Sequence, residues 1–137
     1  MTSSTIEYRL VPGTRASLGK SGVHSVIADR PTGKAGGMGL GLNGGELLAF
    51  ALGGCLSNDL QVLADEAGER IADLKITVTL DFAGTPSRTT AAHIAIDCKL
   101  ESGADPSDLI ERAKALTNIA NSLRAGVPVD IRHESQS

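Results

Sequence analysis

Aromatic side chains are nearly absent from this sequence, which has no Trp, one Tyr and two Phe among its 137 residues. The core must therefore consist of aliphatic side chains. A chain of this length corresponds to one domain, and a small domain buries a comparatively small share of its surface. We therefore expect a single domain that gains stability by associating with another subunit.

The sequence also lacks the marks of several protein classes. With a formal net charge of -3 and no run of Lys or Arg, it does not have the basic surface of a nucleic-acid-binding protein. We identify no apolar stretch long enough to span a bilayer, and the polar N-terminus does not have the form of a signal peptide. These features predict a cytoplasmic protein that binds neither nucleic acid nor membrane.

Cysteine and histidine are scarce as well. The two cysteines, Cys55 and Cys98, are too few for a disulfide scaffold, and cytoplasmic thiols are normally reduced. The three histidines, His24, His93 and His133, do not have the spacing of metal ligands. We therefore predict no metal and no other cofactor.

The hydrophobic pattern predicts an α+β domain with the order β-β-β-α-β-β-α-β, in which a central helix packs on antiparallel sheets. Alternating apolar residues indicate strands near the N-terminus and a long hairpin with one solvated face. A nearly continuous apolar stretch from Leu47 to Leu56 predicts a helix that is buried on all sides. The expected segments are N-terminal strands in 1–30, a Gly-rich loop in 31–44, a central helix in 45–68, a hairpin in 72–101, a second helix in 106–125 and a last strand in 127–132.

The Gly-rich stretch from Pro31 to Gly44 has two interpretations. One is a phosphate-binding loop, but Gly33-Lys34 is followed by Ala35 instead of Ser or Thr, and no buried strand immediately precedes it. The pattern favours the other interpretation, a flexible loop that leads into the central helix.

Cys55 is the most informative residue for chemistry. It follows Gly53 and Gly54 inside the predicted helix, where each glycine costs about 1 kcal/mol relative to Ala. The glycine pair is therefore expected to admit another backbone, most simply a second helix or the same helix of a partner subunit. A thiol beside such a contact can occupy an interface pocket. The alternative is that Cys55 is only a small buried apolar side chain.

The segment around this cysteine, "GGELLAFALGGCLSNDLQVLADEAG", resembles the signature of the OsmC/Ohr family. The order of strands and helices and the Gly-rich lead-in match as well, so the resemblance covers most of the chain. It implies an interlocked homodimer with the cysteine site between the two chains. It also implies reduction of organic hydroperoxides under oxidative stress by a reactive cysteine, a second cysteine that resolves the sulfenic acid, an Arg and a Glu.

The chain departs from the family pattern at the second cysteine. In the matching stretch, "TNIANSL", Thr117 stands where that Cys would be and Asn118 where the family has Pro. Cys98 does not replace it, because it lies on the apolar face of a predicted strand and has the character of core filler. An oxidised Cys55 would therefore need an external thiol reductant, or it would advance to higher oxidation states.

Glu46 and an arginine are the helpers that the resemblance implies for Cys55. Glu46 lies nine residues before Cys55, one fewer than in the peroxidase branch of the family. That spacing is about 13.5 Å along a regular helix, so Glu46 could act only across a dimer interface. Its other role would be to cap its own helix together with Asn43. The family takes its Arg from the N-terminal strands, which makes Arg15 our first candidate and Arg30 the second, although either could be a solvated surface charge.

Two functions follow from these residues. In the first, an enzyme, Cys55 reduces a small organic hydroperoxide, Arg15 stabilises the thiolate and an external thiol completes the cycle. In the second, a non-catalytic dimer of the same fold binds a small apolar or thiol-reactive ligand. Asp59 favours the second function, because an ionised carboxylate one helical turn after Cys55 disfavours the thiolate. A third, weaker option is an interaction platform without a ligand.

Overall fold

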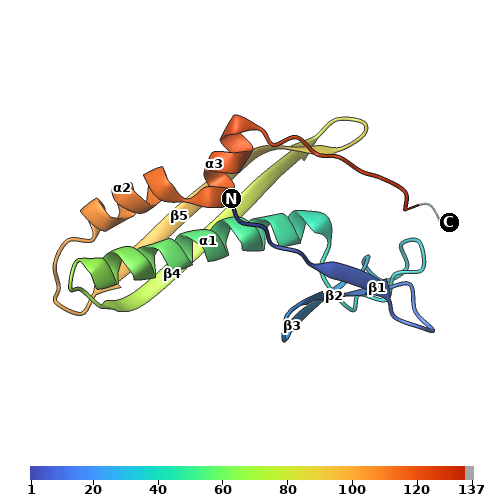
Figure 1. Cartoon of the computed structure of the whole chain (residues 1–137), viewed down its shortest axis with the longest axis horizontal. Helices are drawn as coiled ribbons and strands as arrows, with labels where there is room; N and C mark the ends of the chain where they lie inside the picture. The colour runs from blue at the N-terminus through green and yellow to red at the C-terminus, as the bar shows by residue number, and fades with distance from the viewer. Residues whose placement is uncertain (135–137) are drawn as a thin grey trace. The chain divides into compact units, whose positions relative to one another are not determined.

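A computed structural model describes residues 1–134 of the chain. Contacts divide the chain into two compact units, Met1–Phe50 and the part from Ala51 onward. Helix α1 (Gly44–Glu66) begins in the first unit and continues into the second (Figure 1). The combination of helices and antiparallel sheets confirms the predicted α+β class.

The N-terminal unit contains a three-stranded antiparallel sheet. Its strands are β1 (Glu7–Leu10), β2 (Ser17–Ser21) and β3 (His24–Ala28), paired in the order β1-β2-β3. Strands β2 and β3 are joined at Gly22, whose positive φ of 59° suits a tight turn. The strands that the sequence predicted near the N-terminus are therefore present, and β2 and β3 flank a turn at Gly22.

The Gly-rich segment forms a loop that leads into α1 and is hydrogen-bonded to β3. The backbone N–H of Leu42 donates to the Ile27 carbonyl at 2.8 Å, and the Asp29 N–H donates to the Leu42 carbonyl at 3.1 Å. Gly41 makes this approach possible, because a β carbon there would collide with the Ile27 carbonyl group. The glycines thus serve close backbone packing, which sequence alone cannot distinguish from flexibility.

Asp29 stabilises the same segment through hydrogen bonds to its backbone. Its buried carboxylate accepts the backbone N–H groups of Leu40 at 3.0 Å, Met38 at 3.1 Å and Arg30 at 2.8 Å. The hydrogen bond from Leu40 is the main reason why the pKa of Asp29 is lowered, with smaller contributions from the N–H groups of Arg30 and Met38 and from the Arg30 charge. The backbone amides of Met38 and Leu40 are therefore bound to the chain's own carboxylate, and those of Gly33 and Lys34 donate to the carbonyls of Gly37 and Pro31.

Helix α1 begins with the predicted capping box. The Glu46 N–H donates to Asn43 Oδ1 at 2.8 Å, and the Asn43 N–H donates to Glu46 Oε1 at 3.1 Å. The helix ends at Glu66, and Gly68 shortly after it has a positive φ of 71°, a common feature of helix C-termini. The prediction that this helix is buried on all sides was wrong for the single chain. One face is buried, through Leu52, Leu56, Leu60, Leu63 and Ala64, whereas Phe50 and Val62 are exposed.

The length of α1 corrects a second expectation. With 23 residues it is long and apolar enough to cross a membrane by length and composition, although we identified no such stretch in the sequence. These two criteria alone are weak evidence for a membrane segment, because core helices of soluble proteins meet them too.

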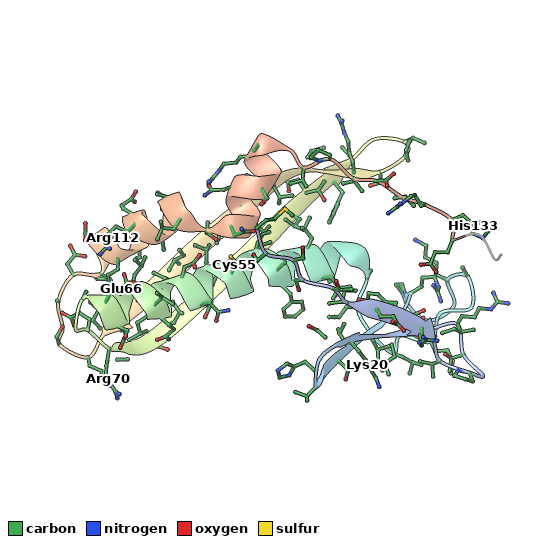
Figure 2. The ribbon with its side chains drawn as sticks, viewed as in Figure 1. Lys20, Cys55, Glu66, Arg70, Arg112 and His133 are labelled. Carbon is green, nitrogen blue, oxygen red and sulfur yellow. The ribbon has the colours of Figure 1, made fainter. Side chains whose placement is uncertain are left out.

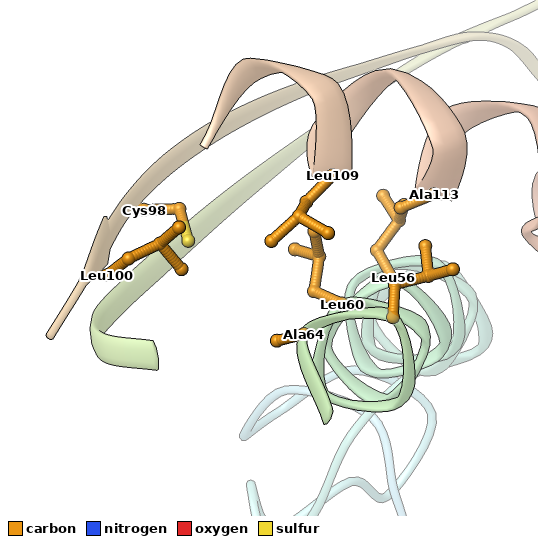
Figure 3. Packing of buried hydrophobic residues seen from close by; sticks show 8 residues of the cluster. Leu56, Leu60, Ala64, Cys98, Leu100, Leu109 and Ala113 are labelled. Carbon is orange, nitrogen blue, oxygen red and sulfur yellow. The ribbon is translucent and has the colours of Figure 1, made fainter. Parts of the chain in front are cut away.

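A two-stranded hairpin and two short helices follow. Strands β4 (Ile71–Ala83) and β5 (Arg88–Leu100) pair antiparallel, with Ile76 opposite Ile96. Helices α2 (Ser107–Leu116) and α3 (Asn118–Ala125) come next. Side chains from α1, β5 and α2 point toward one another in the core (Figure 3). This core contains Leu56, Leu60, Leu63, Ala64, Cys98, Leu100, Leu109 and Ala113.

Two predictions for the C-terminal part were wrong. The expected helix in 106–125 is broken at Thr117, whose ψ of 119° is extended and cannot continue a helix. Residues 127–132 form no strand, and no strand in the described part of the chain pairs with them. The apolar residues of that segment, Val127, Val129 and Ile131, are exposed.

Candidate functional site

Cys55 lies midway along α1 and is only partly buried (Figure 2). The glycines before it face different surroundings. A β carbon at Gly53 would lie 3.2 Å from Val78 Cγ2 and 3.7 Å from Ile76 Cγ2, so Gly53 lets strand β4 approach the helix. In the part of the chain that the structure describes, no atom lies within 4 Å of a β carbon placed at Gly54. The element that Gly53 admits is therefore the hairpin of the same chain, and the surface at Gly54 is open.

The thiol of Cys55 has a carboxylate as its hydrogen-bond partner. Cys55 Sγ donates to Asp59 Oδ2 at 3.8 Å, from one helical turn to the next. The contact between Cys55 and Asp59 that the sequence indicated is thus present, and the carboxylate engages the hydrogen of the thiol.

Glu46 is occupied at the beginning of its own helix. Both its backbone N–H and its carboxylate take part in the capping box with Asn43. This is the structural role that the sequence offered as the alternative. A catalytic role for Glu46 stays a prediction.

The two candidate arginines belong to the N-terminal unit and make contacts there. Arg15 Nη1 donates to the Ala35 carbonyl at 3.4 Å, within the Gly-rich segment. Arg30 Nη2 donates to the Arg15 carbonyl and lies 3.4 Å from Asp29 Oδ1. Arg30 is thus tied to Asp29 and to the backbone of its neighbour. The pairing of Arg15 with Cys55 stays a prediction.

Thr117, which stands at the position of the second cysteine, has an unusual environment. It is 2% exposed and occupies the junction between α2 and α3. Its backbone N–H donates to the Ala113 carbonyl at 3.0 Å, but its hydroxyl makes no capping hydrogen bond to α3. Among the described residues, Thr117 Oγ1 is a buried polar atom without a hydrogen-bond partner. A buried hydroxyl in this state costs about 1–3 kcal/mol.

Cys98 is the core side chain that the sequence indicated. It is buried in the cluster of Figure 3, opposite Leu74 in the hairpin. Burial raises the pKa of the Cys98 thiol, and the nearby charges of Asp97 and Asp73 raise it further. It is therefore a poor nucleophile and does not provide the missing second cysteine.

Sequence reasoning did not identify Thr117 as a buried, unpaired hydroxyl. The available signal was weak: a β-branched Thr followed by Asn in the middle of a predicted helix, where both residues have low helix propensity. Such a pair marks a helix junction more often than its interior.

Comparisons with known proteins converge on one fold. Residues 36–132 match the family model described as OsmC-like protein. A Psychrobacter arcticus protein described as an osmotic stress induced and detoxification response protein is 24% identical, with a TM-score of 0.68 over 89% of this chain and 88% of that chain. An OsmC-like protein from Mycoplasma pneumoniae is 16% identical, with a TM-score of 0.72 over 90% of this chain and 88% of that chain. An organic hydroperoxide resistance protein from Elizabethkingia anophelis is 21% identical, with a TM-score of 0.61 over 90% of each chain. A search of curated protein sequences finds no match.

Proposed function

This chain belongs to the OsmC-like protein family, and on that premise we propose that it is a cytoplasmic stress protein that reduces organic hydroperoxides through Cys55. The reductant in this proposal is an external thiol, and the working unit is a homodimer. Arg15 and Glu46 are the assisting residues, contributed from the N-terminal unit of one chain or the other.

The proposed reaction has two stages. The Cys55 thiolate attacks one oxygen of the hydroperoxide ROOH, the O–O bond breaks, and the leaving alkoxide takes up a proton as the alcohol ROH. Cys55 is then a sulfenic acid. An external thiol attacks its sulfur, releases water and forms a mixed disulfide, and a second thiol releases the reduced Cys55 and a disulfide product. Thr117 cannot take part, because a hydroxyl does not form a disulfide.

The observation that carries the proposal is the position of Cys55. It lies within the residues that match the family model, on the long central helix, with a partly exposed thiol and an open surface at Gly54. Several structures of the same fold are described as organic hydroperoxide resistance proteins, including one from Bacillus subtilis. A reactive thiol must be accessible to its substrate, and Cys55 meets this condition whereas Cys98 does not.

Exposed apolar side chains support the dimer. In the N-terminal unit Leu10 and Val23 are 64% and 94% exposed, and in the C-terminal unit Val129 and Ile131 are 80% and 89% exposed. A partner subunit that packs on these elements would remove the side chains from water, which is favourable. Light scattering on the full chain tests this part of the proposal: we expect twice the chain mass of 14.1 kDa, and a stable monomer would contradict it.

Peroxide consumption by two cysteine variants tests the chemistry. Cumene hydroperoxide and dihydrolipoamide are suitable substrates, and Cys55→Ser is compared with Cys98→Ala. We expect Cys55→Ser to reduce consumption to the rate of buffer alone, and Cys98→Ala to retain the parental rate per folded protein. Equal consumption by the parent and Cys55→Ser would reject the proposal.

The hydrogen bond from Cys55 to Asp59 favours a second candidate, a non-catalytic dimer that binds a small apolar or thiol-reactive molecule. The Cys55 thiol donates its hydrogen to a carboxylate instead of facing a cation, and Thr117 removes the usual resolving step. Slow alkylation of Cys55 at neutral pH, together with no peroxide consumption, would identify this candidate as the correct one.

A further inference from the structure

A cavity of about 330 Å³ lies within the C-terminal unit, at the junction of α2 and α3. Strand β5 contributes Ala92, Ile94 and Ile96, and Leu56 of α1 and Ile110 of α2 complete the apolar part. Its volume is at the lower end of small-molecule sites, which are roughly 300–1,000 Å³. The cavity thus has room for a small ligand with an aliphatic part.

Part of the cavity lining is polar and positive, and we call this part the positive end. Lys114 and Arg124 line it together with Glu111, and Lys114 Nζ pairs with Glu111 Oε1 at 3.0 Å. Arg124 Nη1 donates to the neutral Asn121 Oδ1 at 3.0 Å. Within residues 1–134, Arg124 makes no salt bridge, so its charge is uncompensated at the cavity.

The beginning of α3 adds to this positive end. Thr117 and Ala120, which lie just before and within the first turn of α3, both line the cavity. The N-terminus of a helix carries partial positive charge and presents backbone N–H groups to an anion. The helix end and Arg124 therefore favour the same sign of ligand charge.

Thr117 is the independent observation that points to a ligand. Its side chain is almost completely buried, it lines the cavity, and its hydroxyl lacks any hydrogen-bond partner among the described residues. Buried hydroxyls are normally paired. A ligand oxygen that reaches this hydroxyl would accept its hydrogen and remove the penalty of leaving it unpaired.

We propose that this cavity binds a small aliphatic carboxylate, with the alkyl part against Ile94, Ile96 and Ile110 and the carboxylate held by Arg124 and Thr117. The apolar wall and the positive end account for the two halves of the ligand. None of the binding groups takes part in the thiol chemistry proposed for Cys55. The site therefore stands or falls independently of the peroxidase activity.

Titration of the ¹⁵N-labelled full chain with hexanoate, followed by amide chemical shifts, tests the site. We expect saturable shifts at Ile96, Ala120 and Arg124, and an affinity for hexanoate at least about tenfold higher than for hexanol, which lacks the charge. Cys55→Ser should bind hexanoate as the parent does. Absence of saturable shifts at these amides, as when another subunit fills the cavity, would overturn the proposal.

Two variants at the cavity and one matched control outside it separate a binding role from a structural one. Arg124→Gln should lose most of the preference for hexanoate over hexanol, whereas Arg112→Gln, which makes the same charge change on α2 outside the cavity, should keep it. Thr117→Val has nearly the same shape, and we expect it to bind hexanoate about three- to tenfold more weakly. Equal preferences in Arg124→Gln and Arg112→Gln would contradict the proposal.

Discussion

Replacement of Asp59 by Asn should make Cys55 more reactive. Cys55 Sγ donates to the Asp59 carboxylate at 3.8 Å, and a hydrogen bond to a charged group contributes about 1.5–3 kcal/mol, compared with about 0.5–1.5 kcal/mol for a neutral one. The neutral amide of Asn should therefore hold the thiol about 1 kcal/mol or more less strongly, which is at least about a fivefold change in an equilibrium constant.

The expected gain in reaction rate follows from this difference. The sulfur must give up its hydrogen bond to residue 59 before it attacks, and we expect about half or more of the free-energy difference to appear in the rate. We therefore expect alkylation of Cys55 by iodoacetamide at pH 7 to become about two- to sixfold faster in Asp59→Asn. Peptide mass spectrometry measures the modification at each cysteine separately.

The matched control is Asp65→Asn, which removes the same charge from the same helix about 15 Å along the axis from Cys55. It should leave the alkylation rate unchanged. Equal rates in the two variants would show that the Asp59 contact does not control the thiol. A slower rate in Asp59→Asn would reverse the reasoning, because the carboxylate would then act as a base that accepts the thiol proton.

Three further predictions concern stability and the second thiol. Hydrogen bonds, chiefly from the Leu40 N–H, lower the pKa of Asp29 in the folded chain, so its contribution to stability is present above the unfolded value of about 3.9 and is lost as the pH falls through the lower folded value. Asp29→Asn should therefore flatten the dependence of the unfolding free energy on pH below about pH 4, measured by urea denaturation, and an unchanged slope would contradict this role. Gly41→Ala should destabilise the chain by about 2 kcal/mol or more, because its β carbon meets the Ile27 carbonyl group and the backbone must shift; a melting temperature equal to that of the parent would count against the packing described for this segment. Burial raises the pKa of Cys98, so Cys98 should be alkylated at least about tenfold more slowly than Cys55 in the native chain and at a similar rate in urea; equal native rates would contradict the difference in burial.

Local patterns in the sequence were sufficient for much of the fold. The capping box of Asn43 and Glu46 and the alternation along the hairpin depend on residues close together in the chain, and the structure confirms both. Cys98 could be assigned to the core for the same reason, since it lies in phase with the apolar face of β5.

The features that sequence missed depend on contacts between residues far apart in the chain or on tertiary packing. Asp29 binds backbone groups nine and eleven residues later, and no local propensity encodes that arrangement. The apolar residues of α2 and α3 keep the same helical spacing across Thr117. The sequence therefore indicates a single helix, although the chain forms two. The burial of α1 was overestimated because an apolar residue does not reveal whether its own chain or another covers it.

The Asp29 carboxylate prevents the Gly-rich segment from binding external anions through its Met38 and Leu40 amides. Its oxygens already fill the positions that an incoming phosphate or chloride would take on the Met38 and Leu40 amides. The Asp29 carboxylate thus acts as an intramolecular ligand of these amides, and its effective concentration is high because it belongs to the same chain. An Asp29→Ala chain would expose those donors, and added anions should stabilise it while leaving the parent chain unaffected.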